Sequence, residues 1–204
     1  MAETKSRRRA PGMSPEERRG MIVAAAVPLV AEYGAAVTTS RIARAAGIGE
    51  ATIFRVFADK DELLRACVAE AVRPDHVVRE IASVSLDEPL EQRLVDAADA
   101  LAAHLERMGA VIGSLHASGQ LRGQRDADRQ RPKADDRAES MRQIRDAMAE
   151  LFEPERESLR LQPPKLAATF LGLLFMRARM GEPESLETAE IVALFLHGAF
   201  AEGK

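Results

Sequence analysis

Residues 38–64 read TTSRIARAAGIGEATIFRVFADKDELL and contain two short helical patterns separated by glycine. The first pattern, over 38–48, starts with threonines that can cap a helix and ends at a turn that contains Gly47. The second, over 49–57, places Ile53 and Phe57 at helical spacing. Two short helices joined by such a turn form a helix-turn-helix, so this stretch predicts a small helical domain.

Helix signals continue on both sides of this stretch. Ser14, Pro15 and Glu17 form an N-cap, a first helical position and a capping box, and they predict a helix that ends at Gly34. Asp59 caps a further helix, which we expect to run to about residue 82 and to be kinked or ended by Pro74.

The remaining chain has helical periodicity and no useful strand pattern. Apolar residues recur every three or four positions over 90–115, which predicts a long amphipathic helix. A break at Gly109 or Gly113 would divide it into two helices. Residues 118–137 hold almost no large apolar side chain and predict a loop, and a helix follows from 138. We expect an all-α fold of about nine helices, divided into a basic arm over 1–13, a three-helix helix-turn-helix domain over 14–65 and a helical domain over 66–204.

The last two predicted helices, over 165–180 and 187–201, are apolar on more than one face. A helix that is apolar all round must be buried all round, and the chain has too little further material to cover both. The pattern predicts a homodimer through these two helices, with burial inside a monomer as the alternative.

Charge divides unevenly along the chain. Residues 1–65 hold 11 Lys and Arg against 8 Asp and Glu, a net charge of +3, and include the run Arg7, Arg8, Arg9. Residues 66–204 hold 18 against 24, a net charge of −6. Only the front of the chain is therefore expected to meet an anionic partner.

The composition excludes several classes of protein. A single cysteine excludes an internal disulfide framework and a cysteine-rich zinc site, and the four histidines lie on separate predicted elements. We expect no enzyme activity, no cofactor and no metal site. The longest apolar run, over 167–176, is short of the ~20 residues of a membrane span, and no secretory signal is visible, so we expect a cytoplasmic protein without a membrane partner.

Residues 38–64 resemble the TetR family of bacterial one-component transcription regulators. The similarity extends over about 18–65, near a quarter of the chain, and rests on the Thr-Thr pair, the Ile-Ala helix, the Ala-Gly turn, the aromatic end of the second short helix and the lysine that opens the next. The rest of the chain is similar only in length and in the number and order of helices.

The resemblance implies that the helix over 49–55 enters the major groove of operator DNA. Glu50 can then accept from cytosine N4, and Thr52 and Ala51 can contact a thymine methyl group, whereas arginines and hydroxyls hold phosphates. The residues expected to contact DNA are Thr38, Thr39, Ser40, Arg41, Arg44, Gly49, Glu50, Ala51, Thr52, Phe54, Arg55 and Lys60.

The resemblance also implies a dimer that binds a palindromic operator and is released by a small effector. It favours a repressor over an activator. Methionine and leucine on the expected pocket helices favour an apolar or amphipathic compound. The effector-binding candidates are Leu101, His104, Leu105, Met108, Ile112, His116, Met141, Met148, Phe152 and Phe170, each of which can instead be an ordinary core residue.

Three positions depart from the family pattern. Phe54 stands where tyrosine is common, Val56 where histidine or tyrosine is common, and Ala51 replaces a glycine. The first two changes remove side chains that usually serve phosphates. They leave open an alternative function, a dimeric helical ligand-binding or interaction protein with weakened DNA contacts.

Overall fold

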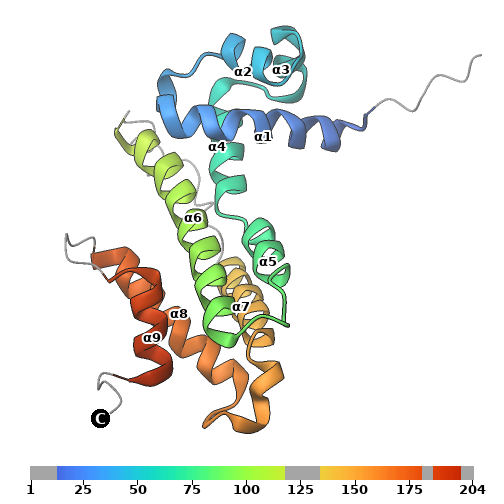
Figure 1. Ribbon diagram of the computed structural model, residues 1–204. Helices are drawn as coiled ribbons and strands as arrows, with labels where there is room; N and C mark the ends of the chain where they lie inside the picture. Colours follow the sequence, from blue (N-terminus) through green and yellow to red (C-terminus); the bar gives the residue numbers. More distant parts are fainter. Residues whose placement is uncertain (1–12, 118–133, 181–185, 199–204) are drawn as a thin grey trace, which may run out of the picture. The chain divides into compact units, whose positions relative to one another are not determined.

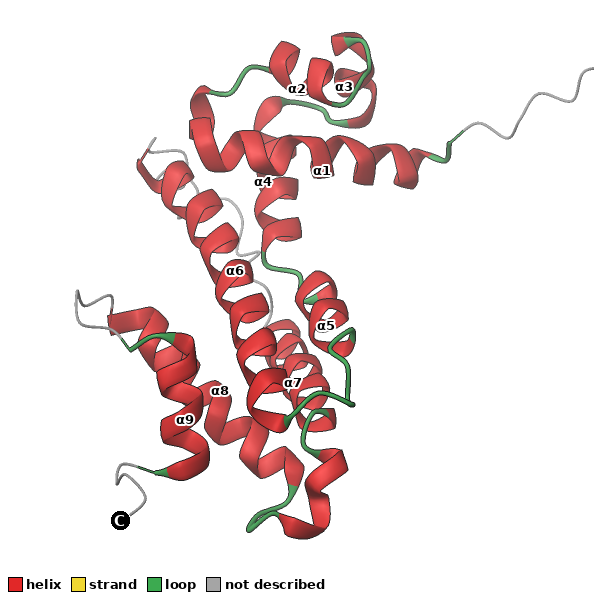
Figure 2. Ribbon diagram, in the orientation of Figure 1, coloured by secondary structure: helices red, strands yellow, loops and turns green. Residues whose placement is uncertain are grey.

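The computed structural model describes residues 13–117, 134–180 and 186–198. Every regular element in these ranges is a helix, as Figure 2 shows by colour. The predicted basic arm lies almost entirely outside the described residues, as does most of the loop predicted over 118–137. The last four residues of that loop are helical, because the following helix begins at Ala134 and not at 138.

The described residues form two compact units, and the first is discontinuous in sequence. It comprises the described residues up to Ala71 together with 110–117, and the second comprises 72–109 and the described residues from 134 onward. The expected domain boundary lay after residue 65. The first unit extends six residues further and also takes in a segment from far along the chain.

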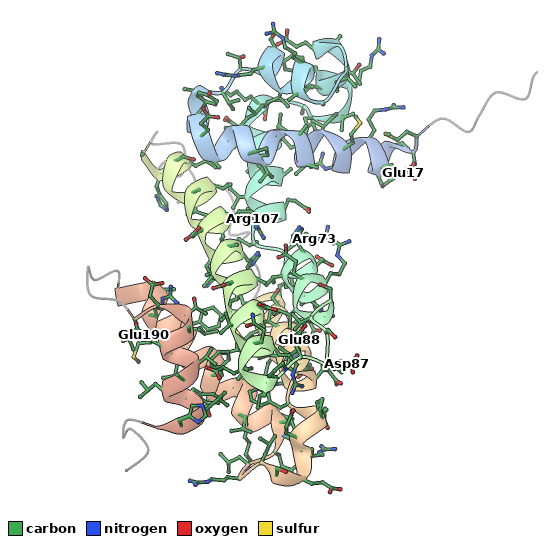
Figure 3. All side chains as sticks on the ribbon, in the orientation of Figure 1. Glu17, Arg73, Asp87, Glu88, Arg107 and Glu190 are labelled. Atoms are coloured by element: carbon green, nitrogen blue, oxygen red, sulfur yellow. The ribbon has the colours of Figure 1, made fainter. Side chains whose placement is uncertain are left out.

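The first unit contains α1 (Pro15–Tyr33), the 3-10 helix η1 (Gly34–Ala36), α2 (Thr39–Ala45), α3 (Glu50–Val56), α4 (Lys60–Ala71) and the last turns of α6 (Leu90–Ala117). The capping box predicted for α1 is present: Ser14 Oγ accepts from the Glu17 backbone N–H at 3.1 Å, and Glu17 Oε2 accepts from the Ser14 N–H at 2.7 Å. Glu17 lies at the start of α1 in Figure 3. The backbone and hydroxyl hydrogen bonds from Ser14 lower the pKa of Glu17.

The core of the first unit lies among α1, α2, α3 and α4, which Figure 1 shows grouped together. The fully buried side chains of this core include Ile22, Ala26, Val30, Ile42, Ile53, Phe57, Leu63, Cys67, Val111 and Leu115. Each of the larger ones, valine, leucine, isoleucine or phenylalanine, contributes roughly 1.5–3 kcal/mol. Val111 and Leu115 come from the end of α6, so that helix completes the core of the helix-turn-helix unit.

One described segment, Pro15–Ala36, is long and apolar enough to cross a membrane by length and composition alone. It is the central helix of the first unit, and Ile22, Ala26 and Val30 on it have no exposed surface. Its apolar face is thus accounted for by a protein core.

The second unit contains α5 (Asp75–Ala82), the first part of α6, α7 (Ala134–Glu150), the 3-10 helix η3 (Glu153–Ser158), α8 (Pro163–Met180) and α9 (Thr188–His197). Figure 1 shows α8 and α9 side by side, and the rings of Phe170 and Phe195 meet there with centroids 5.0 Å apart. Arg177 of α8 also donates to Thr188 Oγ1 of α9 at 3.0 Å.

Two expectations about helix limits are corrected. The helix predicted from Asp59 to about residue 82 is two helices, because α4 ends at Ala71 and α5 begins directly after Pro74. Proline lacks the N–H that a continuing helix needs. Conversely, neither Gly109 nor Gly113 interrupts α6, which is continuous over its 28 residues.

Candidate functional site

All twelve residues expected to contact DNA lie in the first unit, on or next to α2, α3 and the start of α4. Nine of them are exposed, and Thr39, Thr52 and Lys60 are half-buried. The inner sides of the two short helices bury Ile42, Ala43 and Ile53. The apolar periodicity of the sequence therefore divides each helix into a core face and a solvent face.

Thr38 and Arg41 are fixed at the start of α2. Thr38 Oγ1 accepts from the Arg41 backbone N–H at 3.2 Å, as expected of an N-cap, and its own hydroxyl proton stays available to a phosphate. The Arg41 guanidinium lies 3.9 Å from the centroid of the Tyr33 ring and donates to Tyr33 Oη at 2.9 Å. This hydrogen bond uses one N–H of the Arg41 guanidinium, and the other N–H groups stay available.

The C-terminal end of α3 is held by Arg19 of α1. Its guanidinium donates to Glu62 Oε1 at 2.9 Å and to the Val56 carbonyl at 3.4 Å, and it lies over the Phe57 ring at 4.3 Å. Glu62 Oε2 accepts from the Ala58 N–H at 2.8 Å. That backbone bond and then Arg19 lower the pKa of Glu62. Sequence reasoning missed Arg19 because its partners lie 37 and 43 residues away.

The start of α3 is tied to α2 by a side-chain pair. Thr39 Oγ1 donates to Glu50 Oε1 at 2.5 Å, although the two residues lie on different helices. Threonine has one hydroxyl proton, so a Thr39 that makes this bond cannot donate to a phosphate. The bond fixes the direction of an exposed carboxylate in the first turn of α3.

Three cations border this surface. Lys60 Nζ donates to the Ala35 carbonyl at 2.6 Å, which anchors its ammonium and leaves two further protons. Within the described part of the chain, the side chains of Arg44 and Arg55 have no hydrogen-bond or ion-pair partner, and both are exposed. They are the cations most available to an anionic partner. Phe54 of α3 is also exposed, whereas Val56 packs against the core.

A cavity of about 330 Å³ that is partly open to solvent lies in the second unit between α6 and α8. It is lined by Ala98, Leu101, Ala102, Leu105, Glu106, Leu174, Arg177 and Ala178. Its wall is thus mostly apolar, with one acidic and one basic side chain, an arrangement suited to an amphipathic molecule.

Only Leu101 and Leu105 of the ten effector-binding candidates line this cavity. Met148, Phe152 and Phe170 are fully buried in the core, Met141 is exposed on α7, and Met108 is half-buried on α6. Ile112 and His116 belong to the part of α6 that lies in the first unit. The candidates do not form one site, because helical spacing identifies an inward face but not the helix that it meets.

Sequence reasoning missed Arg177 and Glu106. Arg177 interrupts the apolar pattern of α8, and that interruption was the available signal for a polar anchor in this helix.

His104 is buried outside this cavity and is surrounded by charged groups of α5 and α6. Burial is the main cause that lowers its pKa, and Arg107 and His76 lower it further, whereas Glu80 opposes them. Glu80 Oε2 lies 3.1 Å from His76 Nδ1 and 3.7 Å from Arg107, which Figure 3 labels on α6. In the described ranges, no cluster of three or more His, Cys, Asp or Glu side chains is placed to hold a metal ion.

The N-terminal part of the chain matches a known family. Residues 22–67 match the family model of bacterial regulatory proteins, tetR family. This range contains α2, α3 and the first two thirds of α4, and it includes all twelve residues expected to contact DNA.

Solved structures share the fold over most of the chain. A candidate TetR-family transcriptional regulator from Mesorhizobium loti MAFF303099 is 21% identical with a TM-score of 0.57, covering 89% of this chain and 96% of that one. A TetR-family transcriptional regulator from Streptomyces coelicolor is 19% identical with a TM-score of 0.54, covering 90% and 80%. Residues 22–67 thus match the tetR family model, and the fold of the chain is similar to that of solved TetR-family regulators.

Proposed function

We propose that the chain is a cytoplasmic transcriptional repressor that binds a palindromic operator as a homodimer and is released by a small amphipathic effector. The observation that carries the DNA-binding part is the solvent face of α2 and α3. It presents Thr38, Arg41, Arg44, Thr52 and Arg55, while the opposite faces of both helices are buried. Side chains on a rigid exposed helix can reach base edges in the major groove.

The dimer part is supported by apolar side chains that the single chain leaves exposed on α8 and α9. Leu173 and Met176 are 39% and 62% exposed, and Leu194 is 43% exposed. The two helices are already joined to each other through Phe170 and Phe195. A second copy that packs against them would remove this apolar surface from water.

The effector part is supported by the cavity along α6. A molecule seated against Leu101 and Leu105 touches a helix whose later residues, Val111 and Leu115, belong to the core of the DNA-binding unit. An effector that shifts α6 would therefore alter the support of α1, because Ser114 of α6 donates to the Val30 carbonyl. It must bind the released state better than the DNA-bound state, because equal affinity shifts no equilibrium.

The test of function is binding to double-stranded DNA from directly upstream of the protein's own coding region, measured with unlabelled competitors. We expect a shift that specific DNA competes and unrelated DNA does not. Thr52→Ala and Arg55→Ala should each weaken it, with a cost of about 1–3 kcal/mol for a lost base contact. Arg160→Ala, which changes an exposed arginine of the second unit, is the matched control and should leave the affinity unchanged.

The salt dependence separates two roles for Arg55. If it holds a phosphate, Arg55→Ala lowers the salt slope by about one and weakens all sequences alike. If it reads a base, the variant relaxes the preference at one position. Absence of any shift at low salt would contradict the proposed function and favour the ligand-binding alternative.

A further inference from the structure

The solvent face of α2 and α3 contains one feature that does not suit simple attraction to phosphates. Glu50 is an exposed carboxylate in the first turn of α3, and the other charged residues of α2 and α3 are Arg41, Arg44 and Arg55. A carboxylate close to DNA is repelled by the phosphates and lowers non-specific affinity. On a surface that meets DNA, this cost is offset where a base offers the carboxylate a hydrogen-bond donor.

The structure holds this carboxylate in one direction. Thr39 Oγ1 donates to Glu50 Oε1 at 2.5 Å, so one oxygen is engaged by α2 and the other remains free to accept. A polar side chain that is already fixed in the free protein loses less conformational entropy when it binds.

We propose that Glu50 is a specificity-determining residue that selects cytosine at one position of each operator half-site, and that Thr39 is the positioning residue that directs it. This inference rests on the proposed function. In the major groove cytosine presents only the N4 amino donor, guanine presents two acceptors, and thymine presents an acceptor and a methyl group. Adenine offers a donor beside the N7 acceptor, which repels the second carboxylate oxygen. A directed carboxylate therefore favours cytosine over the other three bases.

The experiment selects binding sites from a library of double-stranded DNA with randomised half-sites, using the full chain. The affinity of the selected site is then measured with each of the four bases at every position. The parent protein should show one position per half-site at which cytosine is preferred. A carboxylate–cytosine contact should give a preference of about 5- to 150-fold.

Four variants separate the roles. Glu50→Gln should lose the cytosine preference and shift it toward adenine, which pairs with an amide through N6 and N7. Thr39→Val, which removes the donor and keeps the shape, should weaken the preference at that same position, and Thr39→Ser should restore it. Ser40→Ala removes a neighbouring hydroxyl and should weaken all sequences alike without changing the base preference.

The outcomes distinguish this inference from the function on which it rests. If the parent selects no DNA sequence, both are wrong. If the parent selects a motif and Glu50→Gln selects the same motif with the same preferences, the DNA-binding function stands and the role of Glu50 is refuted. If Glu50→Gln changes the preference but Thr39→Val does not, Glu50 reads the base and the positioning role of Thr39 is refuted.

Discussion

Arg93 is a cation with no exposed surface, buried near the start of α6. Its guanidinium donates to the Leu151 carbonyl at 2.6 Å and pairs with Glu155, while its Nε has no hydrogen-bond partner. The pair is asymmetric, because the Glu155 side chain is 37% exposed. Removal of the carboxylate leaves a positive charge buried with a single carbonyl acceptor.

We expect Glu155→Ala to lower the free energy of unfolding by about 3 kcal/mol, the cost of breaking a buried ion pair from one side. An ordinary exposed pair would give at most about 1 kcal/mol. Glu157→Ala changes an exposed carboxylate in the same 3-10 helix and should stay within about 0.5 kcal/mol. Urea unfolding measures both. Equal, small losses would show that water reaches Arg93 without Glu155.

At the scale of the element, Gly34 links the end of α1 to the end of α6. Its φ is +55°, and a Cβ there would lie 2.7 Å from the Ser114 carbonyl oxygen. Ser114 Oγ also donates to the Val30 carbonyl at 2.7 Å. The contact requires a residue without a side chain, because the atom in the way belongs to the backbone of a helix.

Gly34→Ala should therefore destabilise the protein, by about 1–3 kcal/mol for the backbone strain alone. Gly20→Ala is the matched control, since Gly20 lies inside α1 with open space around its Cα. It should stabilise the protein by about 0.5–1 kcal/mol, because alanine is the better helix former. The two changes in thermal or urea midpoint should have opposite signs. A stabilising Gly34→Ala would disprove the close approach to α6.

The local signals of the helices were sufficient to predict much of the fold. The helix start at Ser14, the N-cap at Thr38 and the helix-turn-helix all depend on residues a few positions apart. The continuity of α6 was not predictable from Gly109 and Gly113, because buried neighbours such as Leu101, Val111 and Leu115 outweigh a glycine cost of about 1 kcal/mol each.

The same distinction applies to the candidate sites. The exposed face of α3 follows from the periodicity of seven residues, and the structure leaves all of its predicted contact residues accessible. The cavity joins Leu101 to Arg177, residues of helices whose pairing no local pattern encodes. The Thr39–Glu50 bond likewise depends on how two short helices pack.

At the scale of the whole molecule, the apolar surface of α8 and α9 predicts the oligomeric state. Light scattering should give twice the 22.3 kDa mass of the chain. Met176→Glu places a charge at a side chain that is 62% exposed in the single chain, and it should yield a folded monomer because an unpaired charge cannot be buried in a dimer. Leu161→Glu, at a side chain 50% exposed between η3 and α8, should remain a dimer.

A monomeric parent at micromolar concentration would contradict the dimer. So would a Met176→Glu variant that keeps the parent's mass. Circular dichroism of both variants controls for loss of helix.

The discontinuous core of the first unit has a consequence for the order of events during protein synthesis. The helices α1 to α4 leave the ribosome first, but Val111 and Leu115 follow about forty residues after α4 has ended. Until they emerge, the nascent helix-turn-helix lacks two of its fully buried side chains and the partner of Gly34. Bringing the end of α6 back to α1 closes a long segment, and this closure has an entropic cost. The contacts that offset this cost can form only after α6 has been synthesised. The helix-turn-helix is thus translated early and completed late. A polypeptide stalled before residue 111 would contain the sequence of α3 without the buried side chains that α6 supplies.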